Sequence, residues 1–293
     1  MTSQQDRPSR RPVCAPGPHY GADEVFHRLL LGPSMARAAG HWEDGEPLGD
    51  TLDEAQERGI DRRVELAAAH GAARVLDLGC GWGTLLHRLT TVHGVERAVG
   101  LGAERTQASF ISGFGNPRVS VRRESWAEHR AERPYDAAFC ADVLERTVPA
   151  SLGRCDRALR YRCFFTSVAG ALAPGARLVL DTVTASRTPI GARPREELRL
   201  LHANEFGGGH LPHPREVAAA TAGLLDVTET VDDSGPYAMS CRAWLDRLEQ
   251  CRDLAVVLAG EEVVRRVARS LRALVTALEC EYLARLRIAA ARV

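Results

Sequence analysis

A glycine-rich loop follows a short apolar run near residue 75. Residues 75–78 are predicted to form a strand, and Gly79, Gly81 and Gly83 follow at alternate positions. Glycines at this spacing let the backbone turn sharply and let a ligand approach the main chain without a Cβ in the way. Asp77, near the carboxyl end of the strand, can help to fix the loop and a charged group of the ligand. The pattern predicts a ligand-binding loop.

The spacing of the glycines argues against a dinucleotide. A dinucleotide fingerprint, GxGxxG, needs its third glycine at position 84, which is Thr84 here. The order DxGxGxG instead resembles the first motif of class I methyltransferases, which bind S-adenosylmethionine. A tight turn that only packs a helix on a strand is the alternative. The resemblance implies these cofactor contacts: Asp77, Gly79, Cys80, Gly81 and Gly83.

Strand and helix patterns alternate around this loop. The expected strands are 74–78, 98–101, 119–122, 135–140 and 177–182, and the expected helices are 84–92, 104–110 and 159–172. Repeated units of this length predict a mostly parallel sheet with helices on both faces. With the resemblance, the expected fold class is α/β, a Rossmann-like class I methyltransferase with a seven-stranded sheet and a helical cap.

The other segments predict additions to this sheet. Residues 1–18 carry Arg and Pro but no apolar core and predict a disordered tail. Residues 19–70 predict an N-terminal helical cap, in which Gly32-Pro33 ends a first helix and the capping-box pattern Thr51-Leu52-Asp53-Glu54 starts a second. Residues 71–293 predict the cofactor-binding domain. Within that domain, the prolines and glycines of 183–214 predict an irregular lid insertion, and 242–291 predict C-terminal helices.

The composition limits the classes of partner. Basic and acidic residues balance at 38 each, so nothing draws the chain to nucleic acid or to an anionic membrane, and a small-molecule substrate is expected. The 8 cysteines form no CxxC pair and no zinc spacing, which predicts no metal site and a cytoplasmic location. No apolar run approaches the ~20 residues of a membrane-spanning helix, so no stable membrane insertion is expected. A homo-oligomer stays open.

Longer segments resemble the cyclopropane fatty acid synthase family, which includes mycolic acid cyclopropane synthases and natural-product methyltransferases. The resemblance runs from His19 to about Leu248. Its main segments are PSM at 33–35, TLDEAQ at 51–56, GCGWG at 79–83, FGGGHLP at 206–212 and YAMSCRAW at 237–244. It implies S-adenosylmethionine as the cofactor and methyl transfer as the reaction.

The resemblance adds cofactor contacts beyond the glycine loop. Gln107 falls where the family has a glutamine that contacts the ribose, which would replace the acid missing at Gly102. Trp126 follows the third strand, where its flat face suits stacking on adenine, although a core tryptophan is an equal alternative. The remaining expected contacts are Leu101, Ser125 and Ala141.

The acidic and aromatic active-site positions of the family fall on Glu145 and Tyr237. Asp181 stands where the family has a histidine, and Ala39 where it has a cysteine. Cyclopropane-forming members use these positions to hold a bicarbonate ion. Here the charge of Asp181 near Glu145 would disfavour that ion unless Arg146 compensates.

We therefore expect Glu145, paired with Asp181, to accept a proton from the acceptor or to stabilise a cation, while Tyr237 orients the reacting group. Ordinary salt bridges are the alternative role for both carboxylates, for Glu145 with Arg146 or Arg160. The predicted function is C- or N-methylation of a small, partly apolar metabolite, as in natural-product or antibiotic biosynthesis. Two alternatives stay open: a cyclopropane or methyl-branched lipid synthase, and an S-adenosylmethionine-binding cyclase that transfers no methyl group.

Overall fold

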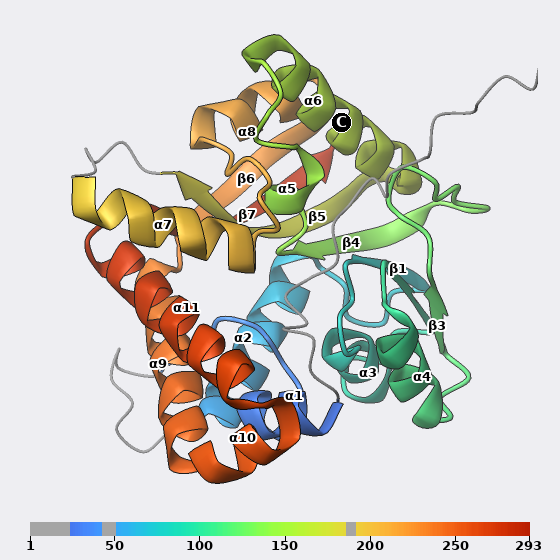
Figure 1. Ribbon diagram of the computed structural model, residues 1–293. Helices are drawn as coiled ribbons and strands as arrows, with labels where there is room; N and C mark the ends of the chain where they lie inside the picture. The colour runs from blue at the N-terminus through green and yellow to red at the C-terminus, as the bar shows by residue number, and fades with distance from the viewer. Residues whose placement is uncertain (1–23, 43–50, 186–191) are drawn as a thin grey trace, which may run out of the picture.

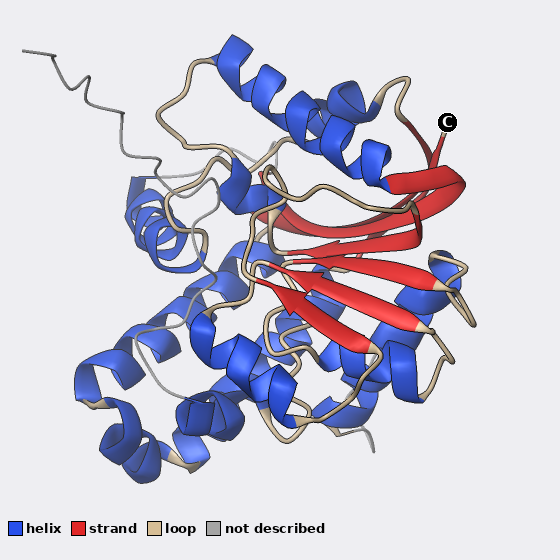
Figure 2. Cartoon of the chain, turned by 90° about the vertical axis from the view of Figure 1, so that its right-hand side faces the viewer, coloured by secondary structure: helices blue, strands red, loops and turns tan. Residues whose placement is uncertain are grey.

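The computed structural model describes residues 24–42, 51–185 and 192–293. A twisted sheet crosses the molecule with helices on both faces, and a separate group of helices lies to one side of it (Figures 1 and 2). The tail predicted at 1–18 and the start of the predicted cap lie outside the described residues. The sheet has seven strands in the order β3-β2-β1-β4-β5-β7-β6.

The strands have these bounds: β1 Arg74–Leu78, β2 Arg97–Leu101, β3 Val119–Arg122, β4 Tyr135–Ala141, β5 Leu172–Ala185, β6 Leu225–Asp232 and β7 Leu283–Arg292. Strands β1 to β5 pair in parallel. β7 runs antiparallel to both of its neighbours, β5 and β6. The five parallel strands expected from the sequence are all present, and the mostly parallel seven-stranded α/β fold is confirmed.

Alternation along the strands divides the core between the two faces of the sheet. On β1, Val75 belongs to the core cluster that contains side chains of α2 and α3, whereas Leu76 packs with Phe164 and Phe165 of α6. Successive strand side chains point to opposite faces, so a central strand covered by helices on both faces must be apolar throughout. This is why the run Val75-Leu76-Asp77-Leu78 is apolar except at Asp77, near its carboxyl end.

The helices have these bounds: α1 Glu24–Leu31, α2 Leu52–Leu66, α3 Thr84–Thr91, α4 Arg105–Gly113, α5 Leu144–Thr147, α6 Arg154–Ala171, α7 Ala192–Glu205, α8 Pro214–Thr221, α9 Ser234–Gln250, α10 Arg252–Ala259 and α11 Glu261–Glu279. Helices α1, α9, α10 and α11 gather beside the sheet (Figure 1). Their shared core includes Phe26, Leu30, Trp244, Leu271 and Leu274. We call this group the helical wall.

Helix α2 begins where the sequence predicts. The Thr51 hydroxyl accepts a hydrogen bond from Glu54 N, and the Glu54 carboxylate accepts one from Thr51 N, which together form a capping box. This arrangement satisfies amide groups that have no partner within the helix. The first helix also ends as expected, because Leu31 is followed by Gly32 in the left-handed conformation.

Two expectations from the sequence differ from the structure. The segment 242–291 is helical only to Glu279, and Leu283–Arg292 forms strand β7. Ala, Leu and Arg favour helices locally, but pairing with β5 and β6 on both sides overrides that preference. The segment 183–214 is not irregular throughout, because β5 continues to Ala185 and α7 covers Ala192–Glu205.

Among the helices of the described ranges, none is long and apolar enough to cross a membrane. Within the same ranges, no group of three or more His, Cys, Asp or Glu side chains is arranged to hold a metal ion.

Candidate active site

A cavity of about 890 Å³ lies beyond the carboxyl ends of β1, β2 and β4. β1 and β4 are neighbours, and the connection after β1 runs to β2 on one side whereas the connection after β4 runs to β5 on the other, which opens a crevice at this point of the sheet. The opposite side of the cavity is formed by apolar side chains of the helical wall and the segment before α2, which include Leu30, Leu31, Met35, Trp244 and Leu271. The cavity thus joins the glycine loop to an apolar surface.

The structure brings most of the predicted cofactor residues together around this cavity. Those that line it are Asp77, Gly79, Cys80, Gly81, Leu101, Gly102, Gln107, Ser125, Trp126 and Ala141. Gly83 is not among the lining residues. It caps α3 in the left-handed conformation, and a Cβ there would lie 2.6 Å from Ile111 Cγ1. Its place in the motif therefore reflects close packing of α3 on α4.

Two glycines of the loop have left-handed backbones but different surroundings. A Cβ on Gly79 would lie 2.3 Å from Val143 Cγ2, so the loop could not pack against the end of β4 with any other residue. A Cβ on Gly81 would meet no heavy atom within 4 Å. Open space therefore remains beside the main chain at Gly81, where a ligand can approach.

Asp77 lies in the cavity wall beneath this loop, with its side chain almost fully buried. Burial raises the pKa of Asp77 to about 7, and the positive charge of Arg63 opposes that shift. A ligand ammonium group would favour the ionised form. The neighbouring Cys80 thiol also has a raised pKa because it is buried, so it is not a thiolate nucleophile.

Trp126 lines the cavity and lies in the segment between β3 and β4. Its ring packs edge-on against Phe164 at 5.3 Å between centroids, and the Arg160 guanidinium lies 5.5 Å from its ring. Its indole Nε1 is buried without a hydrogen-bond partner among the described residues. Trp126 is thus both a core residue and part of the cavity wall, which leaves a stacking role open to test.

Position 102, where an acid is expected, is a glycine, but an acidic residue, Glu104, follows two residues later. Glu104 lines the cavity just past the end of β2. It precedes α4, and its backbone N–H donates to the Gln107 side-chain oxygen at 3.1 Å. Glu104 and Gln107 are therefore held together at the rim of the cavity, and both can reach ribose hydroxyl groups. Glu104 was not predicted from the sequence, because the acid was expected at the end of the strand, at Gly102.

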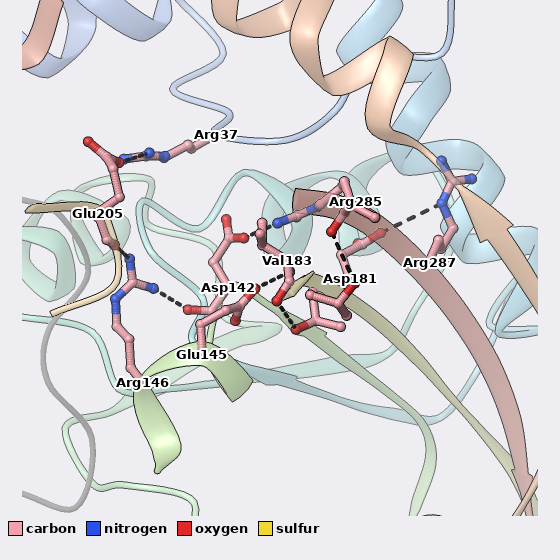
Figure 3. Close-up of polar contacts among 12 residues, drawn as sticks. Arg37, Asp142, Glu145, Arg146, Asp181, Val183, Glu205, Arg285 and Arg287 are labelled. Carbon is pink, nitrogen blue, oxygen red and sulfur yellow. Dashed lines mark hydrogen bonds and ion pairs between the residues drawn. The ribbon is translucent and has the colours of Figure 1, made fainter. Parts of the chain in front are cut away.

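Glu145 lies on α5, fully buried and outside the cavity lining (Figure 3). Its Oε1 accepts a hydrogen bond from Val183 N, and Oε2 is buried without a partner among the described residues. Burial raises the pKa of Glu145 to about 7, and the nearby charge of Asp142 adds to the shift. The salt bridge considered with Arg146 is not formed, because Arg146 donates to the carbonyl groups of Asp142 and Glu205.

Asp181 lies on β5 and is held by two buried arginines. Its Oδ2 accepts from Arg63 Nε at 2.5 Å, and Arg287 Nε lies 3.6 Å from Oδ1. Arg287 also pairs with Asp233, where β6 meets α9. Asp181 is therefore a member of an ion network and does not line the cavity. Its predicted pairing with Glu145 is not among the contacts of either carboxylate.

Tyr237 lies on α9 behind the cavity wall and is likewise buried. Its ring is covered by the guanidinium of Arg285, whose Cζ lies 4.6 Å from the ring centroid. Burial raises the pKa of the Tyr237 hydroxyl, so it stays protonated. The three predicted catalytic side chains, Glu145, Asp181 and Tyr237, therefore lie outside the lining of the cavity.

Several charged residues that were not predicted as site residues also line the cavity, among them Arg37, Arg63, Asp142 and Arg146. Asp142 follows β4 and has φ of 57°, in the left-handed region. Its carboxylate pairs with the fully buried Arg285 of β7 (Figure 3). The arginines come from distant parts of the chain: Arg37 lies between α1 and α2, Arg63 on α2, Arg146 on α5 and Arg285 on β7.

The residues at the glycine end of the cavity fit S-adenosylmethionine. Open space beside Gly81 and the carboxyl group of Asp77 suit the amino acid part of the cofactor. The acid and amide groups of Glu104 and Gln107 suit its ribose, and the Trp126 ring suits its adenine. The sheet order with antiparallel β7, together with this cavity, defines the fold as that of a class I methyltransferase.

Comparison with known proteins gives the family. The chain belongs to the mycolic acid cyclopropane synthetase family, which matches residues 9–287. It is therefore an enzyme of an S-adenosylmethionine-dependent methyltransferase family. Cyclopropane mycolic acid synthase 2 of Mycobacterium tuberculosis is 27% identical over 281 residues, which cover 89% of this chain and 90% of that protein.

Solved structures agree with the fold. The cyclopropane synthase MmaA2 from Mycobacterium tuberculosis superposes with a TM-score of 0.83 at 23% identity, covering 94% of this chain and 96% of that one. The mycolic acid cyclopropane synthase CmaA1 complexed with SAH and CTAB gives a TM-score of 0.80 at 24% identity, with coverage of 94% and 96%.

Proposed function

We propose that this protein transfers the methyl group of S-adenosylmethionine to a partly apolar acceptor that lies against the helical wall. The observation that carries the proposal is the single cavity that joins the glycine loop to Leu30, Met35, Trp244 and Leu271. Its volume of about 890 Å³ lies near the upper end of the roughly 300–1,000 Å³ that small-molecule sites span. Cofactor and acceptor can therefore share it.

The chain's own residues would bind and orient the two partners. S-adenosylmethionine supplies an electrophilic methyl group on a positively charged sulfur. Asp77 and the loop at Gly79 and Gly81 would hold the amino acid end, Glu104 and Gln107 the ribose, and Trp126 the adenine. The apolar side chains of the wall would exclude water and align the acceptor, which is the main requirement for an in-line displacement.

Two acceptor classes remain for this site. The names of the relatives favour an unsaturated lipid chain, which would give a cyclopropane or methyl-branched product. A small natural-product metabolite is the second candidate, for which Arg37 and Arg63 in the cavity wall offer polar contacts. For the first candidate, the charge of Asp181 is not an obstacle, because Arg63 and Arg287 neutralise it.

The test is incubation of the purified protein with methyl-labelled S-adenosylmethionine and, separately, with unsaturated phospholipids and with a pooled extract of small metabolites. S-adenosylhomocysteine and labelled products are followed by mass spectrometry. The proposal predicts S-adenosylhomocysteine together with a product heavier by one labelled methylene. Loss of the double bond would indicate cyclopropanation, and its retention methyl branching. Tight cofactor binding with no label transfer to either pool would contradict the proposal and favour a cyclase.

A further inference from the structure

We propose that Asp142 is the carboxylate that faces the methylated acceptor, balances its positive charge and takes the proton that it releases. The inference rests on the proposed methyl transfer and assigns its acceptor-side residue. Asp142 lines the cavity, whereas Glu145, Asp181 and Tyr237 do not. Its side chain keeps 21% of its surface exposed, in contrast to 1% for its partner Arg285.

The backbone holds Asp142 in this place at a conformational cost. Its φ of 57° is uncommon for a residue with a side chain, and such residues concentrate at functional sites. Three contacts fix the conformation: the Asp142 N–H donates to Asp181 O at 3.2 Å, its carbonyl accepts from Arg146, and its carboxylate accepts from Arg285 (Figure 3). The left-handed turn directs the chain from the end of β4 into α5 at the cavity wall.

Charge distinguishes Asp142 from Glu145. Burial disfavours the charge of Asp142, but Arg285, Arg37 and Arg146 outweigh it and lower the pKa of this carboxyl. Glu145, one turn further on, has a raised pKa because it is buried and lies near Asp142. Asp142 is therefore the more readily ionised of these two carboxyl groups.

A methyl acceptor needs such a fixed negative charge. A neutral acceptor that takes a methyl group uses its own electron pair for the new bond, while the methyl–sulfur bond breaks and its electrons stay on sulfur. The acceptor then carries one positive charge, which a preorganised carboxylate stabilises. Loss of a proton from the acceptor to Asp142 restores neutrality, and the electron pair of the broken bond to hydrogen remains on the acceptor.

The test uses two cofactor analogues and needs no acceptor. Sinefungin carries an amine, protonated at neutral pH, in place of the sulfonium methyl, and S-adenosylhomocysteine carries neither group. Affinities of both are measured by calorimetry at neutral pH for the wild type, for Asp142→Asn and for Asp233→Asn. Asparagine also adopts the left-handed backbone. Asp233 is a matched control, because it is buried and paired with Arg287 but does not line the cavity.

Asp142→Asn is expected to lower the affinity for sinefungin by about tenfold more than the affinity for S-adenosylhomocysteine, since a charge-assisted hydrogen bond is lost. Asp233→Asn should change both affinities by the same factor. If Asp142→Asn lowers the affinity for both ligands equally, or changes neither affinity, the assignment of Asp142 is overturned. If Asp142→Asn does not fold, Asp142→Gly relaxes the backbone and gives the same comparison. Failure of the wild type to bind S-adenosylhomocysteine would overturn the proposed function itself.

Discussion

Arg63 of α2 and Asp181 of β5 form a buried ion pair with an Nε–Oδ2 distance of 2.5 Å, although 118 residues separate them in the chain. Arg63 also lines the cavity and lies close enough to Asp77 to influence its ionisation. The pair therefore connects the N-terminal helix α2 to the sheet directly beside the glycine loop. It also explains why Asp181 is held as a structural anion.

Removal of the Asp181 charge should destabilise the protein. Asp181→Asn leaves Arg63 and Arg287 buried with one anion fewer, and breaking a buried pair in this way costs about 3 kcal/mol of the free energy of unfolding. Urea unfolding measures the change. Asp226→Asn, at an exposed position on β6, is the control and should cost less than about 0.5 kcal/mol. Similar effects of the two substitutions would show that the ion pair adds nothing to stability.

The glycine loop gives a second, sterically matched comparison. Gly79→Ala and Gly81→Ala both place a side chain on a left-handed backbone, but only the Cβ of residue 79 meets Val143 at 2.3 Å. Gly79→Ala should therefore lower the melting temperature more than Gly81→Ala does. The measurement is thermal unfolding without cofactor. Equal shifts would mean that backbone strain alone, and not the contact with the end of β4, requires glycine at position 79.

Glu145 predicts a pH dependence of stability with a definite sign. Its carboxyl has a reference pKa of 4.5 and a pKa of about 7 in the folded protein. Between these values the folded state keeps a proton that the unfolded state has released, so the free energy of unfolding falls as pH rises and levels off above about 7. Asp77, also raised to about 7, adds a contribution of the same sign.

Glu145→Gln removes the share of Glu145 from this dependence. At pH 8 the variant should be more stable than the wild type, by on the order of 1–3 kcal/mol, and its stability should change less between pH 5 and about 8. Urea unfolding of cofactor-free protein across this pH range measures both quantities. A variant with the same slope as the wild type would show that Glu145 titrates normally in the folded state.

The sequence predicted the parts of the site that depend on local signals. β1 and the loop at Gly79 and Gly81 were found because a buried strand needs consecutive apolar residues, and a left-handed turn favours glycine. The start of α2 was predicted from its capping box, because the two residues that form it, Thr51 and Glu54, lie within one helical turn of each other.

The charged half of the site could not be predicted because its partners are distant in the sequence. Arg285 and Arg287 lie on β7, whose residues favour a helix until β5 and β6 pair with it. Asp142 pairs with Arg285 across 143 residues, and its left-handed backbone has no signature in the residue types around it. The resemblance pointed to Glu145, and only the three-dimensional arrangement brings Asp142 to the cavity.

The proposed roles of the cavity residues are tested most directly by a crystal structure of the protein with S-adenosylhomocysteine, since each role depends on where the cofactor lies. We expect the ligand to lie in the cavity, with its amino group at Asp77 and its sulfur directed toward Asp142. Its ribose should contact Glu104 and Gln107, and its adenine should lie against Trp126. A ligand bound elsewhere, or in the cavity with its sulfur turned away from Asp142, would contradict these roles.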